Sequence, residues 1–274
     1  MITYKRDNDK TYDLEIKYML RSYNEKFSNI KDSDCVYLYA LEDDALIGAM
    51  TVNYFWDWAS IGEVFYHNKE TLKQLVQKAW QYYKNKVVGI KYSSPNQNQL
   101  NDFVNAGFRH VNTANYSDEF NFYYADLYAL EEEKFDKNLI SIHSEPIEIY
   151  QKILQKHVEL FRETNNIYDM TETFDMVALD LDKCIGGIQC EVYKDSLYIS
   201  RLAVEQTYRK KGIGTKLMSH TIEFAIKSKL KTIDLGTIEF QARDFYEKFG
   251  FKVIHTRQDN PKGYKSYTLI KKLK

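Results

Sequence analysis

The sequence has little that would point to a metalloprotein, a secreted protein or a membrane protein. Its three cysteines, Cys35, Cys184 and Cys190, are odd in number and lack the spacing of metal ligands. We therefore expect reduced thiols within strands, a cytoplasmic location and no metal site. The start of the chain has no apolar signal core, and no run approaches the roughly 20 apolar residues that a membrane span needs.

An excess of one charge is also missing. The 38 Lys and Arg residues nearly balance the 39 Asp and Glu residues, which gives a formal net charge of −1. A general nucleic-acid surface needs surplus cations, so we expect no nucleic-acid partner, although this balance still allows a local basic patch. With 44% hydrophobic residues in 274 positions, the chain has the composition of a globular protein with one large domain or two of ordinary size.

Several common sequence motifs are absent as well. No Gly-x-x-x-x-Gly-Lys-Ser/Thr loop occurs, which argues against a Walker-type nucleotide site. A dinucleotide fingerprint would need a third glycine where Leu217 stands, and the acidic Asp234 lies inside a strand pattern instead of at its end. No Cys-His or Ser-His arrangement is visible, so we expect no covalent acyl-enzyme.

The most informative stretch that is present is Arg209-Lys210-Lys211-Gly212-Ile213-Gly214. It lies between an apolar strand pattern over 197–204 and an amphipathic helix pattern that begins at Thr215. The first amides of a helix lack internal partners and carry partial positive charge, so a helix N-terminus attracts anions. Two glycines allow close backbone approach, and three cations add charge. The stretch predicts a phosphate-binding turn; a helix start with incidental basic residues is the alternative.

The chain also repeats one order of elements. The strand and helix patterns before the charge run Glu131–Lys134 recur after it. Residues 40–48 align with 178–186 at an offset of 138 (178 − 40), and Gly107 aligns with Gly250 at an offset of 143 (250 − 107). We therefore expect an α/β (α+β mixed) fold of two tandem units, residues 1–135 and 136–274, each a mixed, mostly antiparallel sheet flanked by helices. A chance likeness between two short hairpins is the alternative.

The second half resembles the GNAT family of acyl-CoA N-acyltransferases over about 140–273, and the first half resembles it more weakly. The resemblance is carried by the Arg-x-x-Gly-x-Gly turn and by residues 242–251, which match the family pattern Ala-x-x-Phe-Tyr-x-x-x-Gly-Phe. It implies that acetyl-CoA lays its pantetheine arm along strand 197–204 and its pyrophosphate on the glycine turn. The implied cofactor contacts are Leu202, Ala203, Val204, Arg209, Lys210, Lys211, Gly212, Ile213, Gly214, Thr215, Glu239 and Tyr246.

The resemblance also implies roles for single side chains. Tyr246 falls on the usual acid position, where a neutral phenol could protonate the departing thiolate; packing alone is the alternative. Glu239 stands where many members carry Asn, and could accept from a pantetheine amide or act on the amine; Gln241 is another polar contact. No base is assigned: Tyr198 stands where some members carry Glu, and Glu191 on the preceding strand is either a candidate base or an exposed strand carboxylate.

The function implied by the resemblance is N-acetyl transfer from acetyl-CoA to a primary amine by direct attack, in the second unit. The acceptor would be a small-molecule or peptide amine, recognised by 161–174 and 256–265. The protein would be a monomer or homodimer without membrane partners. A non-catalytic acyl-CoA-binding or sensing module and a pure interaction protein remain alternative interpretations.

The first unit is expected to be degenerate. The two offsets differ by five residues (143 − 138), most simply at the turn, where His67–Glu70 would stand opposite Glu205–Ile213. This shortening removes both glycines and the three cations, and Phe103 stands opposite Tyr246. We therefore expect one acetyl-CoA per chain, with binding retained by a fragment that starts near Asn138 if that fragment folds.

Overall fold

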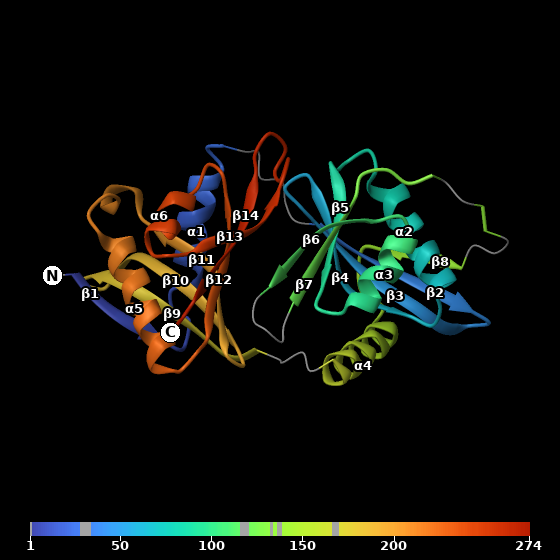
Figure 1. The fold of residues 1–274 in the computed structure, drawn as a ribbon, viewed down its shortest axis with the longest axis horizontal. Coiled ribbons are helices and arrows are strands. Elements are labelled where there is room, and N and C mark those ends of the chain that lie inside the picture. The colour runs from blue at the N-terminus through green and yellow to red at the C-terminus, as the bar shows by residue number, and fades with distance from the viewer. Residues whose placement is uncertain (1, 28–33, 116–120, 132–133, 136–138, 166–169) are drawn as a thin grey trace. The chain divides into compact units, whose positions relative to one another are not determined.

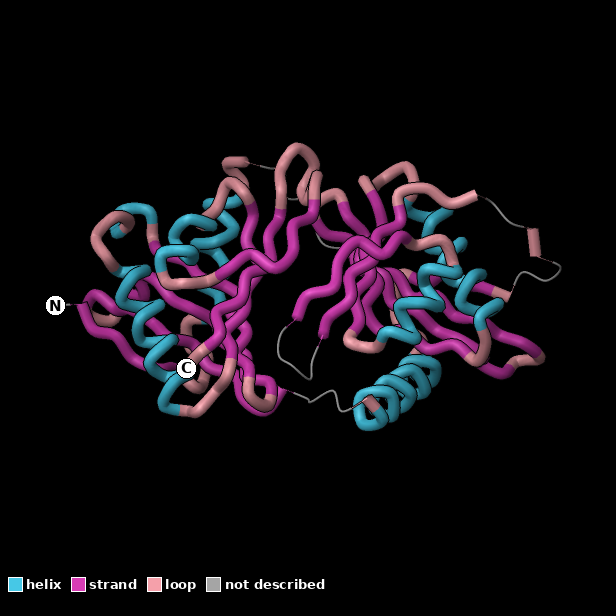
Figure 2. Tube along the Cα trace, viewed as in Figure 1, coloured by secondary structure: helices cyan, strands magenta, loops and turns pink. Residues whose placement is uncertain are grey.

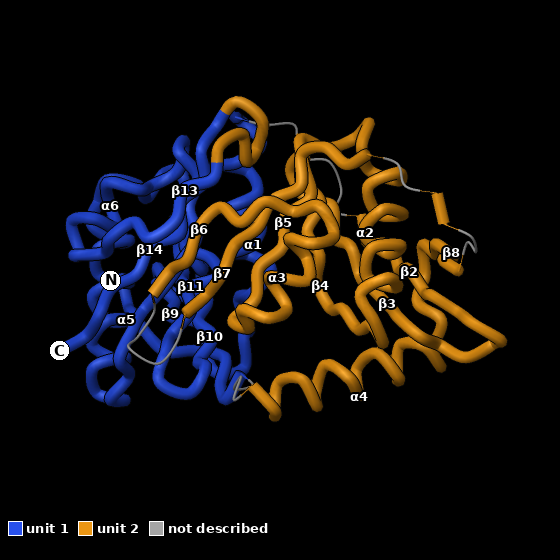
Figure 3. The backbone as a smooth tube through the Cα atoms, turned by 45° about the vertical axis from the view of Figure 1, so that its right-hand side comes forward, with its two compact units in different colours: residues 1–30, 168–257, 264–274 blue, residues 31–167, 258–263 orange. Residues whose placement is uncertain are grey.

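The structure is a computed structural model that describes residues 2–27, 34–115, 121–131, 134–135, 139–165 and 170–274. The chain forms two compact units, coloured blue and orange in Figure 3. Unit 1 consists of residues 1–30, 168–257 and 264–274, and unit 2 consists of residues 31–167 and 258–263. In each unit the strands form one sheet, which carries the helices (Figure 2).

Unit 1 contains a seven-stranded sheet in the order β1-β9-β10-β11-β12-β14-β13. Every neighbouring pair is antiparallel except β11 and β12, which run parallel. Its strands are β1 Ile2–Asp7, β9 Met170–Asp180, β10 Lys183–Tyr193, β11 Ser196–Val204, β12 Thr232–Ile238, β13 Lys252–Arg257 and β14 Ser266–Lys272. Its helices are α1 Asp13–Asn24, the 3-10 turn Gln206–Tyr208, α5 Ile213–Lys227 and α6 Arg243–Lys248.

Unit 2 repeats this plan with the sheet order β8-β2-β3-β4-β5-β7-β6 and one parallel pair, β4 with β5. The two orders correspond strand by strand, which confirms two mixed, mostly antiparallel sheets flanked by helices. Its strands are β2 Asp34–Glu42, β3 Ala45–Phe55, β4 Trp58–Tyr66, β5 Gly89–Ser94, β6 Arg109–Asn115, β7 Asn121–Leu127 and β8 Ile140–His143. Its helices are α2 Lys69–Tyr83, α3 Gln97–Asn105 and α4 Glu148–Thr164.

The first strand and helix of each unit come from the other half of the chain. The N-terminal strand β1 pairs with β9, and α1 packs on β10 and β11, so both join the late strands of unit 1 (Figure 1). Conversely, β8 pairs with β2, and α4 packs on β3 and β4 of unit 2. The compact units therefore differ from the predicted segments 1–135 and 136–274, because strand pairing and helix packing join segments that are far apart in sequence. Glu132, Glu133 and residues 136–138, at the predicted junction, lie outside the described residues.

Close packing holds α1 against the sheet of unit 1. The side chain of Ile16 is 0% exposed and lies in an apolar cluster with Val177, Leu179, Cys184 and Ala203. Gly187 makes this approach possible, because a Cβ atom there would lie 2.4 Å from Cδ1 of Ile16. Truncating such a buried aliphatic side chain to Ala typically costs about 2–5 kcal/mol. The N-terminal segment is thus an integral part of unit 1.

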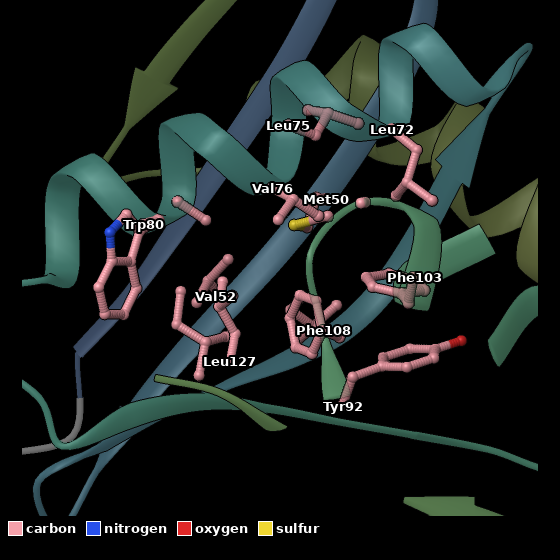
Figure 4. Packing of buried hydrophobic residues seen from close by; sticks show 14 of the residues in the cluster. Met50, Val52, Leu72, Leu75, Val76, Trp80, Tyr92, Phe103, Phe108 and Leu127 are labelled. Carbon is pink, nitrogen blue, oxygen red and sulfur yellow. The ribbon is translucent and has the colours of Figure 1, made fainter. Parts of the chain in front are cut away.

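The main core of unit 2 lies between its sheet and helices α2 and α3 (Figure 4). Leu72 and Val76 of α2 are fully buried there. Phe103 of α3 is also 0% exposed, and its ring stacks on that of Tyr92 with a centroid separation of 3.7 Å. The residue that stands opposite Tyr246 in the repeat is therefore an interior packing residue.

The cysteines lie in strands, as predicted. All three are free thiols: Cys35 in β2 is half-buried, whereas Cys184 and Cys190 in β10 are buried. Burial raises the pKa of the Cys190 thiol, which opposes formation of a nucleophilic thiolate. Within the described segments, no three His, Cys, Asp or Glu side chains are grouped to hold a metal ion. No helix in that part of the chain has the length and apolar character to cross a membrane.

Candidate active site

The candidate site lies where two parallel strands of unit 1 separate. Strands β11 and β12 pair only from Ser196 opposite Thr232 to Ile199 opposite Leu235, and β11 then continues alone on this side to Val204. The amide of Glu205, just after β11, donates 2.9 Å to the carbonyl of Ile185 in β10. Because backbone groups alternate in direction along a strand, those of residues 202 and 204 point away from β10, into the opening between β11 and β12.

The glycine turn follows this strand and borders the same opening. Lys210 and Gly212 have positive φ angles of 61° and 80°, and α5 begins at Ile213. No side chain of the described residues caps the first amides of α5. A Cβ atom on Gly212 would meet nothing within 4 Å, and one on Gly214 would lie 3.7 Å from Phe245 and 3.8 Å from Val204. The structure therefore brings the predicted turn, the end of β11 and helix α6 together around the uncapped start of α5.

The cations of the turn take different positions. Nε of Arg209 donates 2.9 Å to the carbonyl of Val204, and its guanidinium carbon lies 4.4 Å from the ring centroid of Tyr23 in α1. Lys210 is exposed, and Nζ of exposed Lys211 lies 5.1 Å from the ring centroid of Tyr208. Arg209 is thus fixed between strand and helix, while the two lysines leave positive charge at the mouth of the turn.

Tyr246 lies in α6, one residue after the Phe245 ring that borders Gly214. It is 6% exposed and makes edge-on ring contacts with Phe245 and Phe251 at centroid distances of 5.3 and 6.0 Å. Burial raises the pKa of its hydroxyl, so the phenol is neutral at pH 7 and retains its proton. Within the described part of the chain, no hydrogen bond to this hydroxyl occurs, so its proton is available for donation.

Glu239 and Gln241 hold the loop after β12. The amide of Lys265 donates 3.1 Å to Oε2 of Glu239, and the amide of Glu239 donates 2.8 Å to the carbonyl of Lys265. Oε1 of Gln241 accepts 2.9 Å from the amide of Ile238, and its Nε2 donates 2.9 Å to Oδ1 of Asn24 in α1. Both side chains are engaged in fastening the loop, and these contacts give no support to the predicted cofactor contact of Glu239.

Asp234 is a further candidate site residue, which the sequence analysis did not assign to the site. It lies on β12 opposite Tyr198, one pair before the strands separate, and accepts a 3.0 Å hydrogen bond from Oγ of Ser196. Burial raises the pKa of this carboxyl to about 7; the Ser196 bond opposes the rise, and the charge of Glu191 adds to it. Two residues further along the same face, a Cβ atom on Gly236 would meet nothing within 4 Å. A carboxylate between Ile233 and Leu235, in an otherwise apolar strand, was the available signal.

The corresponding place in unit 2 is built differently. Tyr66 corresponds to Val204, because Tyr66 pairs with Gly48 as Val204 pairs with Gly186. Only residues 67–68 separate β4 from α2, against residues 205–212 between β11 and α5. The connection is therefore six residues shorter in unit 2 (8 − 2), at the place where the alignment predicts a shortening of five.

In unit 2, side chains bond to one another and cap the start of α2 at the positions that correspond to the opening in unit 1. Oη of Tyr66 donates 3.0 Å to Oδ2 of Asp102 in α3, and Nζ of Lys69 lies 3.0 Å from Oδ1 of the same carboxylate. Oδ1 of Asn68 accepts 2.8 Å from the amide of Thr71 and caps α2. The strand end, the helix start and α3 are therefore joined by side-chain bonds in unit 2.

Part of the chain is similar in sequence to known acetyltransferases. Residues 126–251 match the family model described as "Acetyltransferase (GNAT) family". The chain is 34% identical over 87 residues to N-alpha-acetyltransferase 50 of Danio rerio, covering 28% of this chain and 51% of that protein. It is 35% identical over 85 residues to N-alpha-acetyltransferase 30 of Schizosaccharomyces pombe, covering 28% and 57%. The chain thus spans about half the length of these relatives.

Two solved structures are also similar. An acetyltransferase from Bacillus cereus ATCC 14579 is 24% identical, with a TM-score of 0.43, and covers 47% of this chain and 95% of its own. An aminoglycoside 6'-N-acetyltransferase complexed with coenzyme A is 22% identical, with a TM-score of 0.34, covering 37% and 73%. Residues 126–251 are thus similar to the GNAT family of acetyltransferases, over somewhat less than half of the 274-residue chain. This segment includes β8 and α4, which the fold assigns to unit 2.

Proposed function

We propose that unit 1 is an acetyl-CoA-dependent N-acetyltransferase that transfers the acetyl group to a primary amine by direct attack. The observation that carries the proposal is the opening between β11 and β12, bordered by uncapped amides of α5 and by α6 with its buried phenol. The relatives named as N-alpha-acetyltransferases support an α-amino group, of a small molecule or a peptide, as the acceptor.

The residues at the opening fit coenzyme A. A pyrophosphate needs donors and positive charge, which the amides after Gly212 and the exposed Lys210 and Lys211 provide. The open space over Gly212 and Gly214 allows close approach to the backbone. Pantetheine amides need backbone partners at a strand edge, which Leu202 and Val204 offer toward the opening.

Each step of the transfer has a group in this unit. Bound acetyl-CoA supplies the thioester carbonyl that the amine attacks. Tyr246 then donates its proton to the departing sulfur, as its neutral hydroxyl allows. We assign the removal of the amine proton to Asp234, acting through water in the space over Gly236. Its pKa near 7 keeps a large fraction of the carboxylate ionised at neutral pH.

Unit 2 is proposed to bind no coenzyme. Asn68 caps the start of α2, where a phosphate would otherwise lie, and Glu70 adds negative charge there. The Tyr66–Asp102 hydrogen bond connects β4 to α3 across the place where Val204 and Phe245 border the opening in unit 1. One acetyl-CoA per chain follows from these contacts.

The test is turnover by the full chain with acetyl-CoA and a panel of primary amines that includes peptides with free N-termini. Amine-dependent release of free thiol, together with an acetylated product found by mass spectrometry, is the expected result. Calorimetric binding of acetyl-CoA without turnover over the whole panel would favour a sensing module. Absence of binding would contradict the coenzyme site itself.

A further inference from the structure

The C-terminal turn of α1 contacts both sides of the opening in unit 1. This helix belongs to the N-terminal segment, which is separated in sequence from the strands that it touches by more than a hundred residues. The inference below rests on the coenzyme site proposed for the opening. It concerns which contacts fix the distance between β11 and β12 at that site.

On the β11 side, α1 holds the start of the glycine turn. The ring of Tyr23 lies under the guanidinium of Arg209 at 4.4 Å, and Nε of Arg209 donates to the carbonyl of Val204. Nearby, Nζ of Lys26 donates 2.8 Å to Oε1 of Gln206 in the 3-10 turn. The aromatic face thus orients the guanidinium, which in turn fixes the strand end next to Gly214.

On the β12 side, the same helix turn holds the loop that leads to α6. Oη of Tyr23 donates 2.8 Å to the carbonyl of Phe240, and the ring of Phe27 stacks on that of Phe240 with a centroid separation of 4.8 Å. Asn24, which is 4% exposed, accepts from Gln241, whose Oε1 also accepts from the amide of Ile238. Residues at the end of α1 and in the turn that follows it therefore contact both sides of the opening.

Strands β11 and β12 are not paired with one another beyond Ile199 and Leu235, so their separation depends on whatever bridges them. Tyr23 is such a bridge, since its ring contacts Arg209 on one side and its hydroxyl bonds Phe240 on the other. We infer that Tyr23 is a positioning residue for the coenzyme site and acts mainly through Arg209. The exchanged N-terminal segment thereby determines the coenzyme affinity of unit 1.

The experiment compares three variants of the full chain. Tyr23→Leu removes the ring and the hydroxyl, and Tyr23→Phe keeps the ring over Arg209. Tyr18→Leu changes a tyrosine of the same helix that is 66% exposed, and it serves as the matched control.

Calorimetry gives the Kd for acetyl-CoA, and steady-state kinetics separates KM for acetyl-CoA from kcat. We expect Tyr23→Leu to raise both Kd and KM roughly tenfold with kcat within about twofold, as loss of one cation–π contact would. Tyr23→Phe loses the hydrogen bond to Phe240 but keeps the ring contact with Arg209, so it should retain most of the affinity. Tyr18→Leu should match wild type.

A double-mutant cycle with Arg209→Gln tests whether Tyr23 acts through Arg209. If the two residues are coupled, the double variant binds acetyl-CoA little more weakly than the weaker of the two single variants. Losses of binding free energy that add up in the double variant would contradict the inferred route through Arg209. If Tyr23→Leu does not fold, the cycle is run with Tyr23→Gln. A Kd equal to that of the wild type in folded Tyr23→Leu, or in Tyr23→Gln where that variant replaces it, would overturn the positioning role and leave the coenzyme site intact. Failure of the wild type to bind acetyl-CoA would overturn the proposed function and this inference with it.

Discussion

Tyr66 of β4 donates a 3.0 Å hydrogen bond to Asp102 of α3, and the equivalent positions in the other unit, Val204 and Phe245, carry only apolar side chains. One repeat therefore has a polar bridge where the other has an opening. The bond also joins a half-buried phenol, whose pKa is raised by burial and by the Asp102 charge, to a carboxylate that is paired with Lys69.

The first prediction concerns this bridge. Tyr66→Phe keeps the ring and removes a hydrogen bond to a charged acceptor, which should lower the free energy of unfolding of unit 2 by about 1.5–3 kcal/mol. Denaturant unfolding measures the loss, and calorimetry of the same variant should show unchanged acetyl-CoA affinity and stoichiometry. A weakened affinity would mean that unit 2 takes part in coenzyme binding.

The second prediction concerns Tyr246. Tyr246→Phe preserves the contacts with Phe245 and Phe251 but removes the proton donor, so the chemical step should slow by about 10²–10⁴-fold at unchanged acetyl-CoA affinity. Tyr267→Phe alters another buried tyrosine of the same core and is the matched control. Single-turnover rates distinguish a proton donor from a packing residue. A Tyr246→Phe rate within about twofold of wild type would show that Tyr246 only packs.

The third prediction is a pH profile. Asp234 must be ionised to accept a proton, and its pKa is raised to about 7, so kcat/KM should increase as the pH rises through about 7. Asp234→Asn should abolish this limb and lower the rate. Glu191→Gln removes a charge that raises the Asp234 pKa, so the limb should move to lower pH while activity remains. A limb that persists in Asp234→Asn, measured with the same amine, would assign it to another group.

The fourth prediction reverses an expectation drawn from the sequence. A fragment beginning near Asn138 was expected to retain coenzyme binding, but it lacks β1 and α1 and keeps β8 and α4, which belong to unit 2. Without Ile16 the face of β10 at Gly187 is uncovered, and without Tyr23 the opening loses its bridge. We now expect the fragment to show no cooperative unfolding transition and no acetyl-CoA binding by calorimetry. A folded fragment with wild-type affinity would show that α1 is dispensable.

Local pattern was enough to predict most elements of the fold. Hydrophobic periodicity and the turn residues determine the strands, helices and repeat, because each depends on neighbouring positions. Strand β1 was missed, because half-buried Ile2 and Tyr4 alternate with exposed polar residues at the edge of the sheet. An edge strand buries little apolar surface, so its sequence shows only a weak hydrophobic alternation.

The exchange of first elements could not be predicted in the same way. Helices α1 and α4 are both amphipathic, and either could cover either sheet. Long-range fit decides between them, such as Ile16 against Gly187 in unit 1. For the same reason the acceptor segment predicted at 161–174 is divided among the end of α4 in unit 2, residues outside the described ones, and the start of β9 in unit 1.

The candidate site was predictable where chemistry depends on neighbouring residues. Gly212 and Gly214 belong to one short sequence motif, and Tyr246 belongs to another. Asp234 and Tyr23 were missed, because their roles depend on burial and on partners from distant segments. Glu239 was predicted by position alone, and its bonds to Lys265 give it a local task.

Titration of the full chain with acetyl-CoA, beside a Gly214→Val variant, tests the central claim most directly. A Cβ atom on Gly214 would make only ordinary contacts of 3.7 Å or more with protein atoms, so the variant should fold, as its melting curve can verify. The added side chain would occupy the space proposed for the pyrophosphate. The account predicts one binding site per chain in the wild type and none in the variant. Two sites per chain, or unchanged affinity in a folded Gly214→Val, would contradict it.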